Sequence, residues 1–165
     1  QPESNYILIP RHSSENRKYI PMGFFSPHHI VSDSCLSIEN ANLYEFGVLQ
    51  SEMHMAWVKY TSGRIKSDYR YSNEMVYNNY PWPIEINEKN KKKVEEKAQK
   101  ILDARAEFPE SSLADLYNQL TMPPKLIKAH QNLDKAVDLC YRTIGFKNES
   151  QRIQYLFELY TQLIK

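Results

Sequence analysis

The spacing of apolar positions along the chain changes near residue 83. Before this point, short runs rich in β-branched and aromatic residues cover positions 6–9 and 19–25, and a polar stretch at 12–18 separates them. This pattern favours two strands joined by a hairpin-like connection. Residues 30–38 could add a further strand, so the first half leans towards β-structure.

One helix is predicted inside this half. Asn42 followed by Glu45 resembles a capping box, and apolar residues then recur at helical spacing over 46–60, until Gly63 can end the helix. This helix should pack against the sheet. Residues 64–80 return to alternating polar and aromatic positions, which predicts an extended segment, and two prolines then break the pattern.

The second half has strong helical periodicity and predicts about four helices. Their expected starts are Asn87, the segment 112–115, the pair Pro123-Pro124 and Asn148. The expected fold class is α+β, with a small β-rich part that carries one packed helix, followed by an all-helical part. We expect the end of one domain at 1–83 and a helical C-terminal domain at 84–165.

Length and composition fit a part of a larger cytoplasmic protein. A chain of 165 residues can bury a sizeable core. It starts with Gln1 rather than Met and shows no signal-peptide pattern, which we interpret as a trimmed piece. No apolar run approaches the roughly 20 residues that span a bilayer, so no membrane role is expected. Cys35 and Cys140 lie far apart, and we expect both to be reduced.

Residues 62–83 carry the chemistry best suited to contact nucleic acid. Cations can neutralise phosphates, hydroxyls and amides can donate to phosphates or base edges, and aromatic rings can stack on bases. The candidates are Arg64, Lys66 and Arg70, then Ser67, Ser72, Asn73, Asn78 and Asn79, then Tyr69, Tyr71, Tyr77, Tyr80 and Trp82. An ordinary half-buried strand pair shows the same alternation, so that alternative stays open. The net charge of +1 neither demands nor excludes DNA.

Several short motifs, in order over nearly the whole chain, resemble one protein family. In the first half they are Tyr19-Ile20-Pro21-Met22-Gly23-Phe24, the segments 50–57 and 63–73, and Tyr80-Pro81-Trp82-Pro83. In the second half they are Leu102-Asp103-Ala104-Arg105, the segment 112–117, and Leu120-Thr121-Met122-Pro123-Pro124. They resemble the end of the target-recognition region and the helical C-terminal region of the MmeI-like DNA methyltransferases, which are single-chain type IIG/IIL restriction-modification enzymes.

The resemblance implies a parent enzyme that methylates adenine N6 with S-adenosylmethionine, can carry a fused endonuclease, and chooses its DNA sequence with its C-terminal part. The catalytic parts are missing from this chain. Its 4 glycines are isolated from one another, so they build no cofactor loop. Residues 79–82, Asn-Tyr-Pro-Trp, only approach the methyltransferase signature Asn-Pro-Pro-Tyr. We therefore expect no catalytic residue, cofactor site or metal site here, and S-adenosylmethionine should bind elsewhere in the parent enzyme.

The remaining candidates for chemistry are weak. Residues 95–97, Glu-Glu-Lys, are the nearest match to a magnesium-binding nuclease motif, but solvated helix charges explain them better. His28 and His29 are adjacent and would point to opposite faces of an extended segment, so they cannot easily share a metal. His54 and His130 are interpreted as packed histidines. An independent hydrolase or nuclease is therefore the least supported function.

The leading hypothesis is a target-recognition part of a site-specific adenine-N6 DNA methyltransferase. It would grip double-stranded DNA while the methyltransferase domain of the same parent chain receives the flipped adenine. The block at 64–73 should contact phosphates or act as scaffold, and polar loops should read bases through Arg11, His12, Arg17, Lys18, His28 and His29. The alternative is a non-catalytic protein-interaction or structural helical module.

Overall fold

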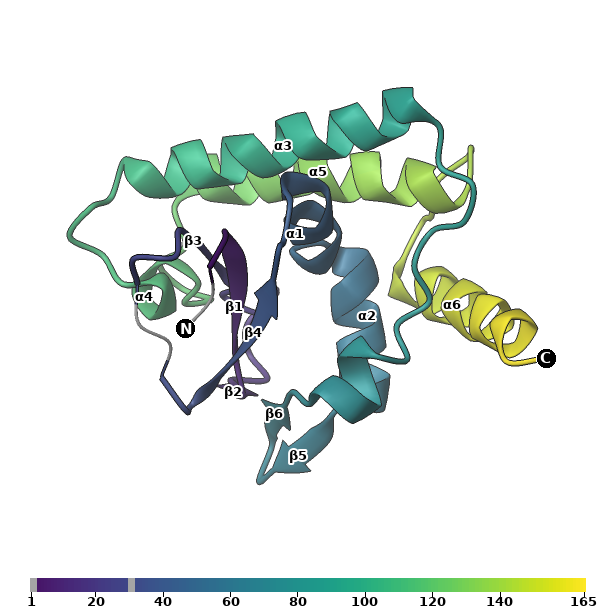
Figure 1. The fold of residues 1–165 in the computed structure, drawn as a ribbon, viewed down its shortest axis with the longest axis horizontal. Coiled ribbons are helices and arrows are strands. Elements are labelled where there is room, and N and C mark those ends of the chain that lie inside the picture. Colours follow the sequence, from purple (N-terminus) through teal and green to yellow (C-terminus); the bar gives the residue numbers. More distant parts are fainter. Residues whose placement is uncertain (1–2, 30–31) are drawn as a thin grey trace.

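Small antiparallel sheets lie in the first half of the chain together with the first helices, and the second half is helical (Figure 1). The computed structural model describes residues 3–29 and 32–165. In the first sheet the strand order is β3-β1-β4, formed by β1 (Tyr6–Pro10), β3 (Gly23–Phe25) and β4 (Cys35–Glu39). The predicted pairing of the two N-terminal apolar runs is confirmed, since Tyr6 lies opposite Phe25. The next strand begins at Cys35, later than expected, and residues 30–31 lie outside the described part.

The second sheet joins segments that are far apart in the sequence. Its strand order is β2-β6-β5, formed by β2 (His12–Ser13), β6 (Asp68–Arg70) and β5 (Gly63–Ile65). The polar stretch between β1 and β3 therefore contributes a short strand of its own. The two sheets meet where the chain passes from β1 into β2, and the β5–β6 hairpin projects at the lower edge of Figure 1.

The prediction of a continuous extended segment over 64–80 is wrong beyond β6. A π-helix, η1 (Asn73–Tyr77), follows, and the hydroxyl of Ser72 caps it by accepting the Met75 N–H at 3.1 Å. The carbonyl of Val76 in this turn accepts the indole N–H of Trp57 at 3.0 Å. A tertiary contact therefore supports a conformation that the local alternation does not favour.

The single helix predicted after Asn42 is in fact two helices, α1 (Leu43–Leu49) and α2 (Glu52–Thr61). The capping box of Asn42 and Glu45 is present. The helix breaks because Ser51 starts α2 as its N-cap, accepting the His54 N–H at 3.3 Å. The side chain of Gln50 meanwhile turns inward and donates to the carbonyl of Ile20 at 2.7 Å.

The four predicted C-terminal helices are confirmed as α3 (Glu88–Ala106), α4 (Leu113–Leu116), α5 (Pro124–Tyr141) and α6 (Glu149–Leu163). Asn87, Ser112 and Asn148 are their expected N-caps, and each accepts a backbone N–H with its side chain. α3 and α5 lie side by side and cover α1, while α6 packs on α2 (Figure 1). The α+β class is therefore confirmed.

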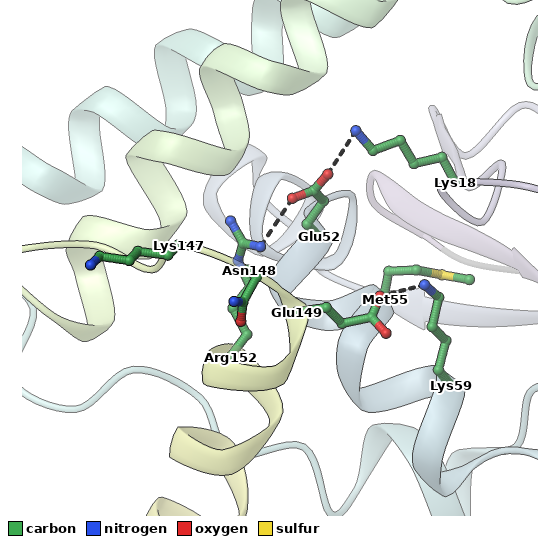
Figure 2. Close-up of a pocket in the computed structure, with 8 residues that line it drawn as sticks. All are labelled: Lys18, Glu52, Met55, Lys59, Lys147, Asn148, Glu149 and Arg152. Carbon is green, nitrogen blue, oxygen red and sulfur yellow. Dashed lines mark hydrogen bonds and ion pairs between the residues drawn. The ribbon is translucent and has the colours of Figure 1, made fainter.

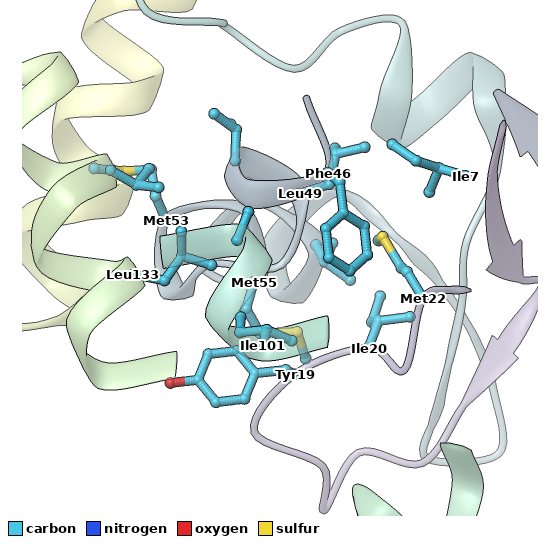
Figure 3. Close-up of a cluster of buried hydrophobic side chains, with 14 of the residues drawn as sticks. Ile7, Tyr19, Ile20, Met22, Phe46, Leu49, Met53, Met55, Ile101 and Leu133 are labelled. Atoms are coloured by element: carbon cyan, nitrogen blue, oxygen red, sulfur yellow. The ribbon is translucent and has the colours of Figure 1, made fainter. Parts of the chain in front are cut away.

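One hydrophobic core runs through both halves of the chain (Figure 3). Ile7 and Phe46 from the first half and Ile101 and Leu133 from the second are fully buried in it. α1 and α3 approach closely at Gly47, where an added Cβ would lie 2.7 Å from the Cγ1 of Val94. The division at residue 83 stays a prediction, and any two domains here would share this core.

Candidate nucleic-acid interface

The second sheet arranges the predicted phosphate-binding residues on two different faces. In the middle strand, Arg70 lies opposite His12 on β2, whereas Tyr69 lies opposite Arg64 on β5. Directly opposed residues share a face and successive residues alternate. Arg70 and His12 therefore lie on one face, and Arg64 lies on the other. The two arginines that the sequence placed together are separated by the sheet.

Arg64 is engaged within the protein. Its Nη1 donates to the carbonyl of Ser67 at 2.7 Å, and its guanidinium lies 4.1 Å from the ring centroid of Tyr69. The carboxylate of Glu15 lies 3.9 Å from the same nitrogen. Tyr69 is only 4% exposed, so Arg64 covers a buried ring. These contacts brace the β5–β6 hairpin, and Arg64 is the cation of this hairpin least free to leave it.

Three other candidates on this segment are exposed, and their side chains form no hydrogen bond, ion pair or ring contact with the residues that the structure describes. They are Lys66, Arg70 and Asn73. Lys66 lies at the hairpin turn with a φ of 57°, which directs the chain sharply back into β6. Ser67 is also exposed, whereas Ser72 uses its hydroxyl to cap η1. Lys66, Ser67, Arg70 and Asn73 therefore form the accessible part of the predicted block.

The expected stacking role of the aromatic residues is wrong for three of them. Tyr69, Tyr71 and Tyr80 are 4%, 2% and 4% exposed, so no base can stack on their faces. Tyr77 and Trp82 are half-buried and pack edge to face with centroids 6.2 Å apart. The strand-packing alternative explains these rings, because their faces are occupied by the core of the protein.

The loop candidates lie at separate places around the sheets. Arg11 follows β1, is exposed, and donates through Nε to the carbonyl of Asp33 at 3.1 Å. Arg17 is half-buried, and its guanidinium has no partner within the described ranges. His28 and His29 are exposed in the turn after β3, where the ring of His29 lies 5.1 Å from that of Phe25. Two of these candidates lie near the β5–β6 hairpin. The carbonyl of Arg11 accepts the Tyr71 N–H at 2.9 Å, just after β6, and Glu15, two residues before Arg17, contacts Asp68 and Arg64.

Lys18 belongs to a different environment. Its Nζ lies 2.7 Å from Glu52 at the start of α2, and the other oxygen of Glu52 lies 3.1 Å from Arg152 on α6 (Figure 2). Arg152 also forms a two-pronged pair with Asp138, at 3.0 and 2.8 Å. The same pocket of about 250 Å³ contains the ion pair of Lys59 with Glu149 (Figure 2). Lys18 is thus part of a salt-bridge network that connects the first half of the chain to α6 through Glu52.

The two inner histidines are packed, as predicted. His54 is 1% exposed, its Nε2 lies 2.9 Å from the hydroxyl of Tyr71, and burial lowers the pKa of His54 to about 3. His130 is fully buried between the hydroxyl of Tyr117 at 2.6 Å and the carbonyl of Gln50 at 3.0 Å. Burial, and secondarily the charge of Arg105, hold the pKa of His130 well below its usual range. Both rings are neutral parts of the core.

Arg105 is the centre of a buried polar network between the two halves. It is 9% exposed and donates to the carbonyl of Met22 at 2.7 Å and to the side-chain oxygen of Gln50 at 2.6 Å. It also donates to the hydroxyl of Tyr117 at 3.0 Å, and its guanidinium lies over the rings of Phe46 and Tyr117. It forms no ion pair with the carboxylates of the described part. Neutral acceptors and aromatic faces alone hold this cation.

Within the described residues, no group of three or more His, Cys, Asp or Glu side chains could hold a metal ion. No helix in that same part of the chain is long and apolar enough to cross a membrane. Cys35 and Cys140 are both free thiols, as predicted, and burial raises the pKa of Cys140 to about 11.

Comparison with known proteins decides the family. Residues 1–84 match the family model of the MmeI target recognition domain, and residues 86–165 match that of the MmeI C-terminal domain. The chain belongs to the MmeI family. The resemblance found in the sequence motifs is therefore confirmed. The β5–β6 hairpin and the Arg11, Arg17 and His28 loops all lie in the part that matches the MmeI target recognition domain.

Two relatives extend this assignment. DNA methyltransferase A of Bacillus subtilis (strain 168) is 44% identical over 161 residues, which cover 97% of this chain and 18% of that protein. A solved structure of the type IIL restriction-modification enzyme MmeI in complex with DNA is 48% identical, with a TM-score of 0.93, and the match covers 99% of this chain and 22% of that chain. The chain thus spans about a fifth of the length of these MmeI-family relatives.

Sequence reasoning missed one part of the surface beside these candidates. Asn118, Gln119 and Leu120, in the turn between α4 and α5, line a groove together with Ser14, Asn16 and Arg17. The apolar spacing predicted that Leu120 would lie on the short second helix with Leu113 and Leu116, but α4 ends at Leu116 and leaves Leu120 exposed. One sequence pattern could have indicated this turn: Leu120 is an apolar residue among turn-forming polar residues, shortly before two prolines.

Proposed function

We propose that this chain is the DNA-recognition part of a site-specific adenine-N6 DNA methyltransferase of the restriction-modification type. The observation that carries the proposal is the β5–β6 hairpin, which presents Lys66 and Arg70 to solvent inside the segment that matches the MmeI target recognition domain. The similarity to MmeI, whose structure was solved in complex with DNA, supports it.

The rest of the parent enzyme would carry the chemistry. Its methyltransferase domain would bind S-adenosylmethionine, the methyl donor, and would receive the adenine flipped out of the duplex. The chain described by this structure would hold the duplex in register around that base and would dock on the methyltransferase domain of the same parent enzyme. Where the parent enzyme carries a fused endonuclease, this part would also direct that domain to its DNA.

The geometry refines the roles within the interface. Arg70 and Lys66 are exposed cations, so they are assigned to phosphates, which set orientation and add affinity on any sequence. Arg64 is assigned to bracing the hairpin. Arg11 and His28 are assigned to base edges in the grooves, together with His12, Arg17 and His29. Lys18, held by Glu52, is the weakest of the loop candidates because a DNA contact would compete with that ion pair.

Salt-dependent DNA binding tests the proposal. We expect the chain to bind a mixed-sequence duplex with an affinity that falls as salt rises, because phosphate contacts release counterions. Arg70→Ala should weaken binding to every duplex alike and lower the slope of log affinity against log salt by about 1. Lys135→Ala is the matched control, since it removes an exposed cation on α5.

Two outcomes would contradict the proposal. Absence of binding at the lowest salt would favour a docking module, and equal losses for Arg70→Ala and Lys135→Ala would remove the hairpin from the interface. The division of roles has its own test. Arg11→Ala and His28→Ala should change the preference among duplex sequences, and a uniform loss across all sequences would refute their assignment to bases.

A further inference from the structure

A groove of about 250 Å³ lies between the loop at 14–17 and the turn that precedes α5. Ser14, Asn16 and Arg17 line one side, and Asn118, Gln119 and Leu120 line the other. The lining carries one cation, several amide groups and a hydroxyl, and it carries no carboxylate. This composition suits a polyanion that offers hydrogen-bonding edges. An acidic lining, which would favour a basic partner, is absent from this set of residues.

The turn that forms one side is held firmly by its own hydrogen bonds. The carbonyl of Asn118 accepts the N–H of Thr121 at 3.2 Å and of Met122 at 3.0 Å. The side-chain oxygen of Asn118 accepts the Leu120 N–H at 2.9 Å. Asn118 therefore fixes the turn, whereas the side chains of Gln119 and Leu120 extend into solvent. A preorganised turn loses little conformational entropy when it meets a partner.

Leu120 is 91% exposed, more than any other large apolar side chain in the part of the chain that the structure describes. An isolated surface leucine needs no explanation. This one stands beside Gln119 at the edge of a polar groove, on a turn whose backbone is fixed. Apolar side chains in such positions contact thymine methyl groups or insert between base steps, and glutamine amides pair with the edge of adenine.

The groove is continuous with the hairpin described above. The backbone N–H of Glu15 donates to Asp68 in the β5–β6 hairpin at 3.2 Å, and the carboxylate of Glu15 lies 3.9 Å from Arg64. Arg17, two residues later, lines the groove, and its guanidinium has no partner among residues 3–29 and 32–165. A path of adjacent residues thus leads from the hairpin through the loop at 14–17 to the turn before α5.

We propose that the turn at 118–121 is a second DNA-contacting element, in which Gln119 and Leu120 contact base edges of the duplex that the hairpin holds. The proposal rests on the DNA-recognition function proposed above. It extends the interface from the part that matches the MmeI target recognition domain to the part that matches the MmeI C-terminal domain. The C-terminal helices would then contact DNA as well as support the sheets.

Leu120→Ser tests this contact, with Ile144→Ser as its matched control. Ile144 is 82% exposed in the turn after α5, so the two apolar side chains lie at opposite ends of an 18-residue helix, about 27 Å apart. Both variants should keep the thermal midpoint of the parent chain. Leu120→Ser should bind the duplex about five- to tenfold more weakly, because it loses apolar contact with the bases. Ile144→Ser should bind like the parent chain.

The salt dependence separates this contact from the phosphate contacts. Leu120→Ser should keep the salt slope of the parent chain, whereas Arg70→Ala should lower it. Gln119→Ala should weaken binding most for the preferred duplex. Unchanged affinity of Leu120→Ser, or an equal loss for Ile144→Ser, would overturn the inference while leaving DNA binding by the hairpin intact. A parent chain that binds no duplex at any salt would overturn the proposed function, and this inference with it.

Discussion

Asp134 should make the stability of the protein fall as pH rises from about 4 to 7. This side chain is 5% exposed on α5, and it accepts the hydroxyl of Tyr19 at 2.6 Å and the Glu52 N–H at 2.8 Å. Burial is the main cause that raises the pKa of Asp134 from 3.8 to about 7, and the nearby carboxylate of Glu52 adds to it. The hydrogen bonds and Lys18 oppose this rise without cancelling it.

The sign follows from where the proton binds. The folded state holds a proton on Asp134 up to a pH of about 7, whereas the unfolded chain releases it near 3.8. The stabilisation is therefore complete below the unfolded pKa and is lost as pH rises through the folded pKa. At about 1.4 kcal/mol per pH unit, the full window corresponds to about 4 kcal/mol, which is an upper bound for the loss.

Denaturant unfolding of the parent chain and of Asp134→Asn at several pH values between 4 and 8 measures this effect. Asn cannot ionise, so the unfolding free energy of the variant minus that of the parent should grow with pH and level off above 7. Taking the difference cancels the titration of other groups. Asp103→Asn is the control, because hydrogen bonding by Gln99 lowers the pKa of this exposed carboxyl. A difference for Asp134→Asn that stays flat within about 0.5 kcal/mol would refute the reasoning.

Two further changes test the packing between the halves and the buried histidines. Gly47→Ala should destabilise the fold by about 2 kcal/mol, because the new Cβ would lie 2.7 Å from the side chain of Val94. Gly63→Ala is the control and should cost less, because its new Cβ would lie 3.8 Å from Arg70. Denaturant unfolding midpoints measure both changes. His54→Phe should make stability less sensitive to acid: the folded pKa of about 3 lies below the unfolded 6.5, so the parent chain loses stability as pH falls below 6.5. Equal acid sensitivity of the two proteins would contradict this.

The elements that the sequence predicted well are those with local causes. α3, α5 and α6 have side-chain caps, prolines or long apolar stripes within their own residues, and their starts were expected within a residue or so. The break between α1 and α2 combines the local cap of Ser51 with a distant contact. The apolar stripe continues through it, and Asp134, which accepts the Glu52 N–H, lies 82 residues away in the sequence. No local pattern contains that contact.

The sequence predicted which segment carries the candidate site, but it did not predict how the side chains of that segment are arranged on the sheet. The block at 64–73 lies in the part that matches the MmeI target recognition domain, as expected. Its division between two faces depends on β2, whose His12 pairs with Arg70 across more than fifty residues. The same long-range pairing buries Tyr69, so a ring suited to stacking became a core residue. Strand register decides which residues are accessible, and a single sequence does not contain it.

The buried network of Arg105 limits how such proteins can be recombined. Its acceptors at Met22 and Gln50 lie before residue 84, and Tyr117 and His130 lie after it. A chimera that joined the first half of one relative to the helices of another would bury the Arg105 cation beside acceptors that come from a different protein and need not match its geometry. An exchange between relatives should therefore keep both halves together, or should transplant the first half with positions 105, 117 and 130.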